Sequence, residues 1–217
     1  MTALPRREQK RIERTRQILN GALKVFAEQG FSGATMDAVA GAAGITKPTL
    51  YQYFSSKQDL FKAMMAAERD DMLVSFGDPS ADRMVEQLHD FAWAYADTVM
   101  RPDLLSLARL IIGEAQRFPA IGEAYQQSGP DRVLEALMIY LTAQRVAGRL
   151  SFDDAELAAQ DFWGLILSAP RTKALYEPES APSRSEIARY VENGLKVFLK
   201  AYSTTPAEDL ARLQAIL

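Results

Sequence analysis

The 217-residue chain contains no cysteine and a single histidine, His89. Without thiols it cannot form a disulfide, a zinc–thiolate site or a cysteine nucleophile, and one imidazole cannot build an HExxH or multi-histidine metal centre. No run approaches the roughly 18 apolar residues of a membrane span, and no apolar segment follows the charged amino terminus as in a signal peptide. We therefore expect a cytoplasmic protein with no cofactor, no bound metal and no contact with a membrane.

Positive charge is concentrated at one end of the chain. Residues 1–62 hold ten basic and five acidic side chains, a net charge of +5, whereas the remaining residues carry −8. A basic segment attached to an acidic one suggests that only the first part meets a polyanion. The alternative is that the first helix is simply charged and solvated.

Apolar residues recur at helical spacing throughout, and no alternating strand pattern is present, so the sequence predicts an all-α fold. In the amino-terminal part, the signals that begin or end four helices are Gly30, Thr35, Gly44, Thr46 and Ser56. Turn-forming residues 76–80 predict a joint between domains. Longer helices are predicted over 81–100, 102–117, 130–147 and 153–168, then over 184–202 after a loop that contains Pro170.

Residues 35–54 have the layout of a helix-turn-helix. Two short helices meet at a tight turn, where Gly44 supplies the open backbone and Ile45 fills the angle between them. The amino-terminal part of the second helix enters the major groove in this motif. Side chains suited to reading base edges are Lys47, Pro48, Thr49 and Gln52. Side chains suited to phosphate are Thr35, Thr46, Tyr51, Tyr53 and Lys57.

Residues 12–65 resemble the DNA-binding domain of the tetracycline-repressor (TetR) family of bacterial regulators. The resemblance is carried by Ala43-Gly44-Ile45, by residues 49–54 (TLYQYF) and by Ser56-Lys57. It places at the family's base-reading positions Lys47, Pro48, Thr49 and Gln52, and at its phosphate-binding positions Thr35, Tyr51, Tyr53 and Lys57. It also places Asp37 where some members carry a basic residue that contacts a base. A carboxylate cannot bind phosphate, so we expect the contact that the basic residue makes to be absent here. Arg6, Arg7, Lys10 and Arg11 would form a basic arm before the first helix, and the alternative is a disordered tail.

The resemblance implies a DNA-binding domain at residues 1–62 and a helical domain for ligand binding and dimerisation at residues 63–217. Residues 107–168 also resemble the AefR-like subgroup. Candidates for a pocket that takes a small apolar or amphipathic effector are His89, Trp93, Met100, Phe118, Tyr125, Phe162 and Trp163. Arg109, Glu114 and Arg117 could hold the polar end of that ligand. Most of these residues could equally belong to the core or to a solvated face.

Two helices carry an interior glycine, Gly164 and Gly194, which costs about 1 kcal/mol relative to alanine unless another helix approaches closely. The predicted homodimer interface therefore comprises Gly164, Ile187, Val191, Gly194 and Phe198. The alternative is that these faces close the core of one protomer. A symmetric pair of heads would read the two halves of a palindromic operator in double-stranded DNA.

The function expected is that of a ligand-responsive, homodimeric repressor, whose effector changes the spacing of the two heads. A hydrolase centred on His89 would need a serine and a carboxylate converging on it. Asp90 follows His89 but points about 100° away on a helix, and no nucleophile or phosphate-loop motif is present, so we expect no enzyme. A helical adaptor that binds protein through the acidic segment is the other alternative, and it would show no sequence-specific DNA binding.

Overall fold

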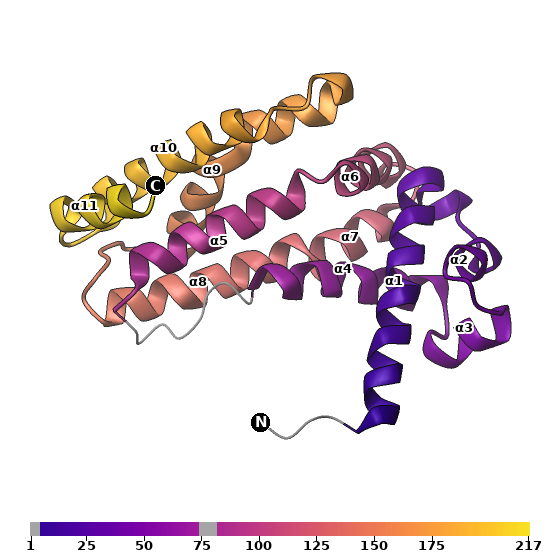
Figure 1. The fold of residues 1–217 in the computed structure, drawn as a ribbon. Helices are drawn as coiled ribbons and strands as arrows, with labels where there is room; N and C mark the ends of the chain where they lie inside the picture. The colour runs from indigo at the N-terminus through magenta and orange to yellow at the C-terminus, as the bar shows by residue number, and fades with distance from the viewer. Residues whose placement is uncertain (1–4, 74–81) are drawn as a thin grey trace. The chain divides into compact units, whose positions relative to one another are not determined.

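The computed structural model describes residues 5–73 and 82–217, and within these ranges the regular elements are helices (Figure 1). Leu150 and Ser203 also form an isolated antiparallel β-bridge. The predicted all-α fold is confirmed. The first four helices are α1 (Arg6–Gly33), α2 (Met36–Ala42), α3 (Lys47–Tyr53) and α4 (Lys57–Leu73). The others are α5 (Met84–Val99), α6 (Pro102–Ala115), α7 (Pro119–Ser128), α8 (Pro130–Val146), α9 (Ala155–Tyr176), η2 (Pro178–Ser180), α10 (Arg184–Tyr202) and α11 (Pro206–Ile216).

The structure departs from the predicted helices in the second half of the chain. Helices α7 and α11 were not predicted, and each begins with a proline in its first turn and buries an apolar residue, Ile121 or Leu213. Helix α9 continues through Pro170 to Tyr176, where the sequence predicts a loop. Pro170 and Ala174 are buried, and this packing offsets the roughly 3 kcal/mol cost of an interior proline. The joint predicted at residues 76–80 lies outside the described residues.

The chain divides into two compact units. The first, which we call the head, comprises the described residues up to Glu68 together with Pro102–Gly129. The second, the body, comprises Arg69–Arg101 and Pro130–Leu217. The compact head therefore includes α6 and α7, which lie far along the chain, whereas the DNA-binding domain predicted from the sequence ends at residue 62. Within the described ranges, no helix combines the length and apolar character required to cross a membrane.

The head is organised around α1. Its buried stripe of Ile18, Ala22 and Phe26 is fully enclosed, and the Phe26 ring lies 5.4 Å from Phe61 of α4 and 5.7 Å from Phe31. Gly30 has a φ of 70°, so the regular part of α1 ends there, as its position in the sequence predicts. Helix α6 packs on the same core through Leu107 and Ile111, with Ile121 of α7. This core fixes α1, which packs against α2, and α2 in turn packs against α3.

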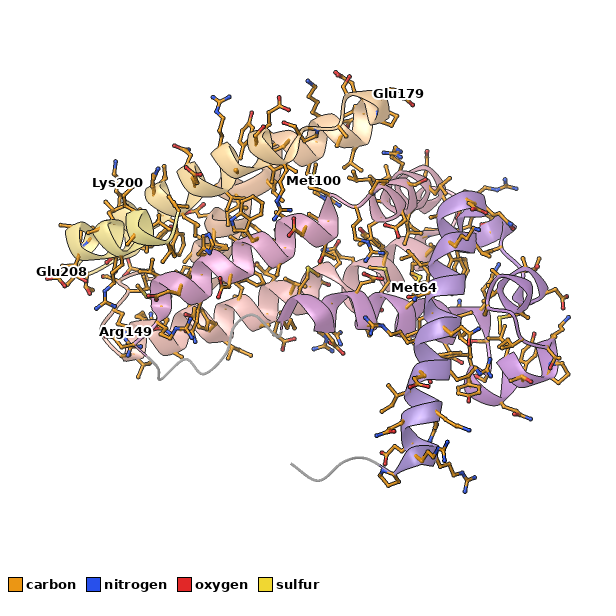
Figure 2. All side chains as sticks on the ribbon, in the orientation of Figure 1. Met64, Met100, Arg149, Glu179, Lys200 and Glu208 are labelled. Carbon is orange, nitrogen blue, oxygen red and sulfur yellow. The ribbon has the colours of Figure 1, made fainter. Side chains whose placement is uncertain are left out.

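The body has its own core, built from α5, α8, α9, α10 and α11. Phe162 of α9 lies between Phe91 and Phe198, with ring centroids 5.9 and 5.0 Å away. Polar and charged side chains such as Lys200 and Glu208 are exposed on the outside of α10 and α11 (Figure 2). Gly194 lets α10 approach α9 closely, because a Cβ at this position would lie 2.7 Å from the carbonyl oxygen of Leu165.

This close approach predicts opposite effects for two Gly→Ala substitutions. Gly194→Ala should lower the free energy of unfolding by about 1–3 kcal/mol, because the added methyl meets backbone that cannot move freely. Gly113→Ala, at a helical position of α6 where a Cβ would meet nothing within 4 Å, should raise it by about 0.4–1 kcal/mol. Urea unfolding followed by circular dichroism measures both. Equal effects would contradict the account of the α9–α10 contact.

Candidate nucleic-acid interface

Helix α3 presents its predicted base-reading side chains to solvent. Thr46 caps the helix, accepting a hydrogen bond from the Thr49 amide at 3.3 Å, and Leu50 anchors it as a fully buried residue. Because Leu50 points into the head, the opposite face is directed outward. Lys47, Pro48 and Gln52 are exposed and Thr49 is half-buried. One helix therefore carries all four predicted base-reading residues, three of them fully on its outer face.

The turn before α3 is held against α1 by two residues that the sequence analysis did not single out. The Gln17 side-chain amide donates to the carbonyl of Ala43 at 2.7 Å, and Arg14 donates to the Gln17 amide oxygen at 3.1 Å. A Cβ on Gly21 would lie 2.9 Å from the Ala43 nitrogen, so only glycine permits this contact. Gly44 has a φ of 62°, the left-handed conformation that its place in the turn predicts.

Two of the predicted phosphate-binding residues cap α2 and α3, and a third lies on α3 itself. Thr35 caps α2 and accepts from the Ala38 amide at 3.1 Å, and Thr46 caps α3 in the same way. Both hydroxyls are exposed, so each could also donate to a phosphate oxygen. Tyr51 follows on the outer side of α3 with 47% of its surface exposed.

Asp37 is paired with Lys47. Its carboxylate lies 2.8 Å from the Lys47 ammonium, so the acidic residue of α2 is joined to the first residue of α3. The Asp37 hydrogen bond and charge raise the pKa of Lys47 above its usual value. Both side chains remain at least half exposed, at 66% for Asp37 and 50% for Lys47, and the pair is part of the outer surface.

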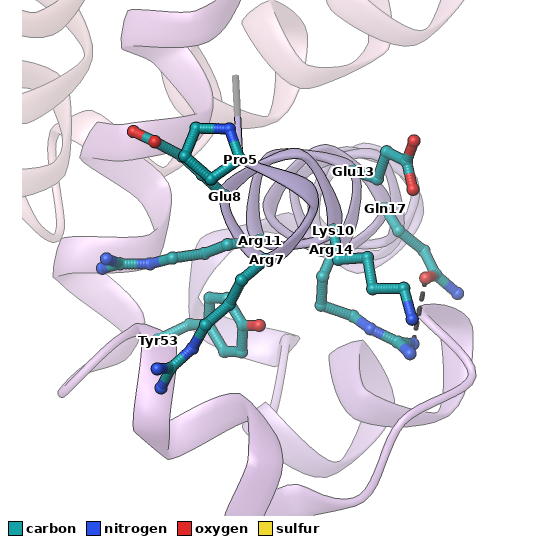
Figure 3. A pocket seen from close by; sticks show the side chains of 9 residues that line it. All are labelled: Pro5, Arg7, Glu8, Lys10, Arg11, Glu13, Arg14, Gln17 and Tyr53. Atoms are coloured by element: carbon teal, nitrogen blue, oxygen red, sulfur yellow. Dashed lines mark hydrogen bonds between the residues drawn. The ribbon is translucent and has the colours of Figure 1, made fainter. Parts of the chain in front are cut away.

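The predicted basic arm is helical. Arg6 is the first residue of α1, so Arg6, Arg7, Lys10 and Arg11 occupy the first two turns of a helix and do not form an extended tail. Figure 3 shows Arg7 and Arg11 on the side of Tyr53, and Lys10 beside Arg14. A hollow of about 1010 Å³ lies here, lined by Pro5, Arg7, Glu8, Lys10, Arg11, Glu13, Arg14, Gln17 and Tyr53. Its four cations outnumber its two carboxylates, so an anion is favoured there.

The Lys57 side chain contacts backbone carbonyls and an aromatic ring of the head, which the sequence does not predict. Its ammonium donates to the carbonyls of Phe31 and Ala34 at 2.6 and 2.8 Å, and lies 4.6 Å from the centre of the Phe31 ring. Partial burial lowers the pKa of the Lys57 ammonium, and the Glu114 carboxylate opposes this effect. The Lys57 side chain therefore hydrogen-bonds the backbone that follows Gly30, and its assignment to phosphate stays a prediction.

Two family models match the chain. Residues 18–64 match the model described as bacterial regulatory proteins of the tetR family, and residues 86–204 match the AefR-like transcriptional repressor, C-terminal domain. The second match alone covers more than half of the chain. The chain belongs to the TetR family. Its AefR-like domain spans all of residues 107–168, on which the subgroup resemblance was based, so that prediction is confirmed.

Solved TetR-family structures resemble the chain over most of its length. A TetR-family regulator from Mesorhizobium loti MAFF303099 is 27% identical, with a TM-score of 0.75, and the match covers 89% of this chain and 98% of that one. The flavonoid-responsive regulator FrrA is 34% identical, with a TM-score of 0.66, over 88% and 98% of the two chains.

Curated relatives are matched over smaller parts. The activator FasR of Mycolicibacterium smegmatis is 43% identical over 63 residues, 29% of each chain. The regulator SrpR of Pseudomonas putida is 29% identical over 76% of this chain and 75% of its own length. The chain thus spans less than a third of FasR but three quarters of SrpR. By name, both relatives are HTH-type regulators of transcription, and FasR is an activator.

The predicted effector residues are divided between the two units. Phe118 and Tyr125 belong to the head, whereas the other five belong to the body. Phe162 is fully buried among other rings, so it belongs to the core. His89 and Trp93 on α5 and Trp163 on α9 are half-buried, as is Met100 directly after α5. Glu114 accepts a hydrogen bond from the Ser32 amide at 3.4 Å, at the end of α1, and does not serve a ligand in the body.

The predicted dimer residues are mostly internal to one protomer. Val191 and Phe198 have no exposed surface, and Gly194 is covered by α9, so these three cannot meet a partner. The alternative stated for these helix faces, closure of the protomer core, is correct for them. Ile187 is half-buried against the same core. Gly164 alone is exposed, and a Cβ there would meet nothing within 4 Å.

The position of Lys57 predicts that its substitution affects the free energy of unfolding, whereas substitution of a lysine on α1 affects the salt dependence of DNA affinity. Lys57→Met should lower the free energy of unfolding by about 1–3 kcal/mol, because it leaves carbonyls without their partner, and should not change the slope of log K against log salt for DNA. Lys10→Met, on the exposed first turns of α1, should leave unfolding unchanged and flatten that slope by about one. Urea unfolding and DNA titration at several salt concentrations measure the two. A flattened slope for Lys57→Met would show that Lys57 binds phosphate.

Proposed function

We propose that this TetR-family protein is a ligand-responsive repressor that binds a palindromic operator in double-stranded DNA as a homodimer. The observation that carries the proposal is the outward face of α3. Lys47, Pro48 and Gln52 are exposed on a helix whose buried side is fixed by Leu50. A surface of donors and acceptors on a helix, projecting from a positively charged head, is suited to the major groove.

The base-reading chemistry follows from the side chains. Gln52 can make a bidentate contact to adenine, and Lys47 can donate to guanine acceptors. Pro48 and the Thr49 methyl can pack on a thymine methyl. Thr35, Thr46, Tyr51 and Tyr53 would bind phosphates, together with the basic first turns of α1.

The homodimer would form through the outer faces of α9 and α10. Exposed residues on α9 at helical spacing include Leu157 and Gly164, and the outer stripe of α10 includes Tyr190 and Val197. Leu157, Tyr190 and Val197 leave 58%, 44% and 39% of their surfaces exposed, and they recur at helical spacing on these two faces, so each face offers an apolar stripe. A four-helix interface from two protomers would cover them.

The effector would bind in the body. Among the buried polar atoms of the described residues, the indole nitrogen of Trp163 has no hydrogen-bond partner, and the Trp163 ring lies 5.4 Å from Tyr95. An acceptor on a small amphipathic molecule would satisfy this donor. The flavonoid-responsive FrrA, 34% identical, favours a flat aromatic ligand among such molecules. The effector would act by binding one spacing of the two heads more tightly than the other.

Selection of bound DNA from a random pool tests the proposal, and we expect a palindrome with half-sites about one helical turn, or a multiple of it, apart. Gln52→Ala should relax the preference at one base pair per half-site and cost about 1–3 kcal/mol there. Gln58→Ala, on an exposed position of α4 outside this surface, is the matched control and should leave the selected sequence unchanged. Failure to select any sequence would favour the adaptor alternative.

The oligomeric state has its own test. Gly164→Arg should yield a folded monomer at concentrations where the wild type is a dimer, because a guanidinium would be buried without a partner at the proposed interface. Ile139→Arg, on an exposed position of α8 where 67% of the side chain is accessible, should remain dimeric. Analytical ultracentrifugation distinguishes the two. A dimeric Gly164→Arg protein would show that copies associate through another surface.

A further inference from the structure

The ion pair between Asp37 and Lys47 presents a hydrogen-bond donor and an acceptor side by side. The Lys47 ammonium and a carboxylate oxygen of Asp37 are 2.8 Å apart, and at least half of each side chain is exposed. The ammonium has three protons and uses one on Asp37, and the carboxylate has further lone pairs. Each member can therefore make a second hydrogen bond without breaking the pair.

One base pair offers the complementary arrangement in the major groove. In a G·C pair, the guanine O6 accepts and the cytosine N4 donates, and both also face the groove. These two atoms are hydrogen-bonded to each other, so they lie about 2.9 Å apart. An ammonium opposite O6 and a carboxylate opposite N4 would close a ring of four hydrogen bonds, with donor and acceptor spacing matched on the two sides.

We propose that Asp37 and Lys47 act together as one unit that reads a single G·C base pair in each half-site. The inference rests on the proposed function, since it assigns a base pair to the surface described there. It gives Asp37 a positive role in specificity, beyond the loss of a phosphate contact. A carboxylate repels phosphate, whereas cytosine N4 is the donor that Asp and Glu accept from, so the pair is suited to a base edge and not to the backbone.

The pair also differs from a free lysine in what it contributes. Because Asp37 cancels the Lys47 charge, binding through this unit neutralises no phosphate and adds nothing to the salt slope. Its contribution appears as discrimination at one position. A structural tie between α2 and α3 alone would instead affect stability and leave the base preference intact.

The experiment measures affinities of the full-length protein for its selected operator and for versions in which each base pair of a half-site is replaced in turn. Asp37→Ala and Lys47→Ala should each abolish the preference for G·C at the same position, a loss of about fivefold or more, with other positions unchanged. The double variant should lose no more at that position than either single variant, because the two residues work as one unit. Glu28→Ala, which removes a carboxylate from an exposed position of α1, is the control and should affect all operators equally.

Several outcomes would overturn the inference. Asp37→Ala could strengthen binding to all operators alike, as is expected of Glu28→Ala. This result would show that Asp37 only repels DNA phosphate and reads no base. The two single variants could lose preference at different base pairs, or their effects could add. In each case the wild type still selects a palindrome and the proposed function stands. If the wild type selects no sequence, the proposed function itself fails. Circular dichroism of each variant separates a loss of fold from a loss of discrimination.

Discussion

The placement of α3 depends on the close contact between α1 and the turn that precedes it. Gly21 lets the backbone of Ala43 lie directly on α1, and Gln17 holds the Ala43 carbonyl at 2.7 Å. Leu50 then fixes the rotation of α3, since its side chain is fully buried in the head. Every property of the outer surface follows from this, because the residues that face solvent are those opposite Leu50. Arg14, which donates to Gln17, links the same contact to the basic turns of α1.

The head includes more of the chain than its amino-terminal helices. Helix α6 packs on the core of α1, and Ser106 donates to the Ala27 carbonyl at 2.9 Å. A Cβ on Gly30 would lie 2.6 Å from a Glu114 carboxylate oxygen, so α6 closely covers the point where α1 ends. Lys57 joins this junction from α4 through the Phe31 and Ala34 carbonyls. Segments far apart in sequence thus stabilise the end of α1, and one of them belongs to the part of the chain matched by the AefR-like model.

The sequence predicted what depends on short-range signals. Thr35 and Thr46 cap helices, and Gly44 adopts a positive φ, because these properties depend on a few neighbouring residues. It did not predict what depends on the partner. An ammonium at position 57 suits phosphate and carbonyl oxygen equally, and only the packed structure shows that the carbonyls of α1 are in reach. Likewise, an apolar stripe with a glycine predicts that another helix approaches closely, but not whether that helix belongs to the same protomer. At Gly194 the approaching helix is α9 of the same protomer. The sequence predicts a break at Pro170, because the cost of an interior proline is local, whereas its burial depends on residues elsewhere in the fold.

The proposed function requires that two copies of α3 occupy successive major-groove faces of one DNA site. Protection of guanine N7 from methylation by dimethyl sulfate measures this directly, since N7 lies in the major groove. The account predicts two protected clusters in the selected operator, related by the palindrome and separated by about 34–36 Å or a multiple of it. A single cluster, or affinity for the site with no protected guanine in either half, would contradict it.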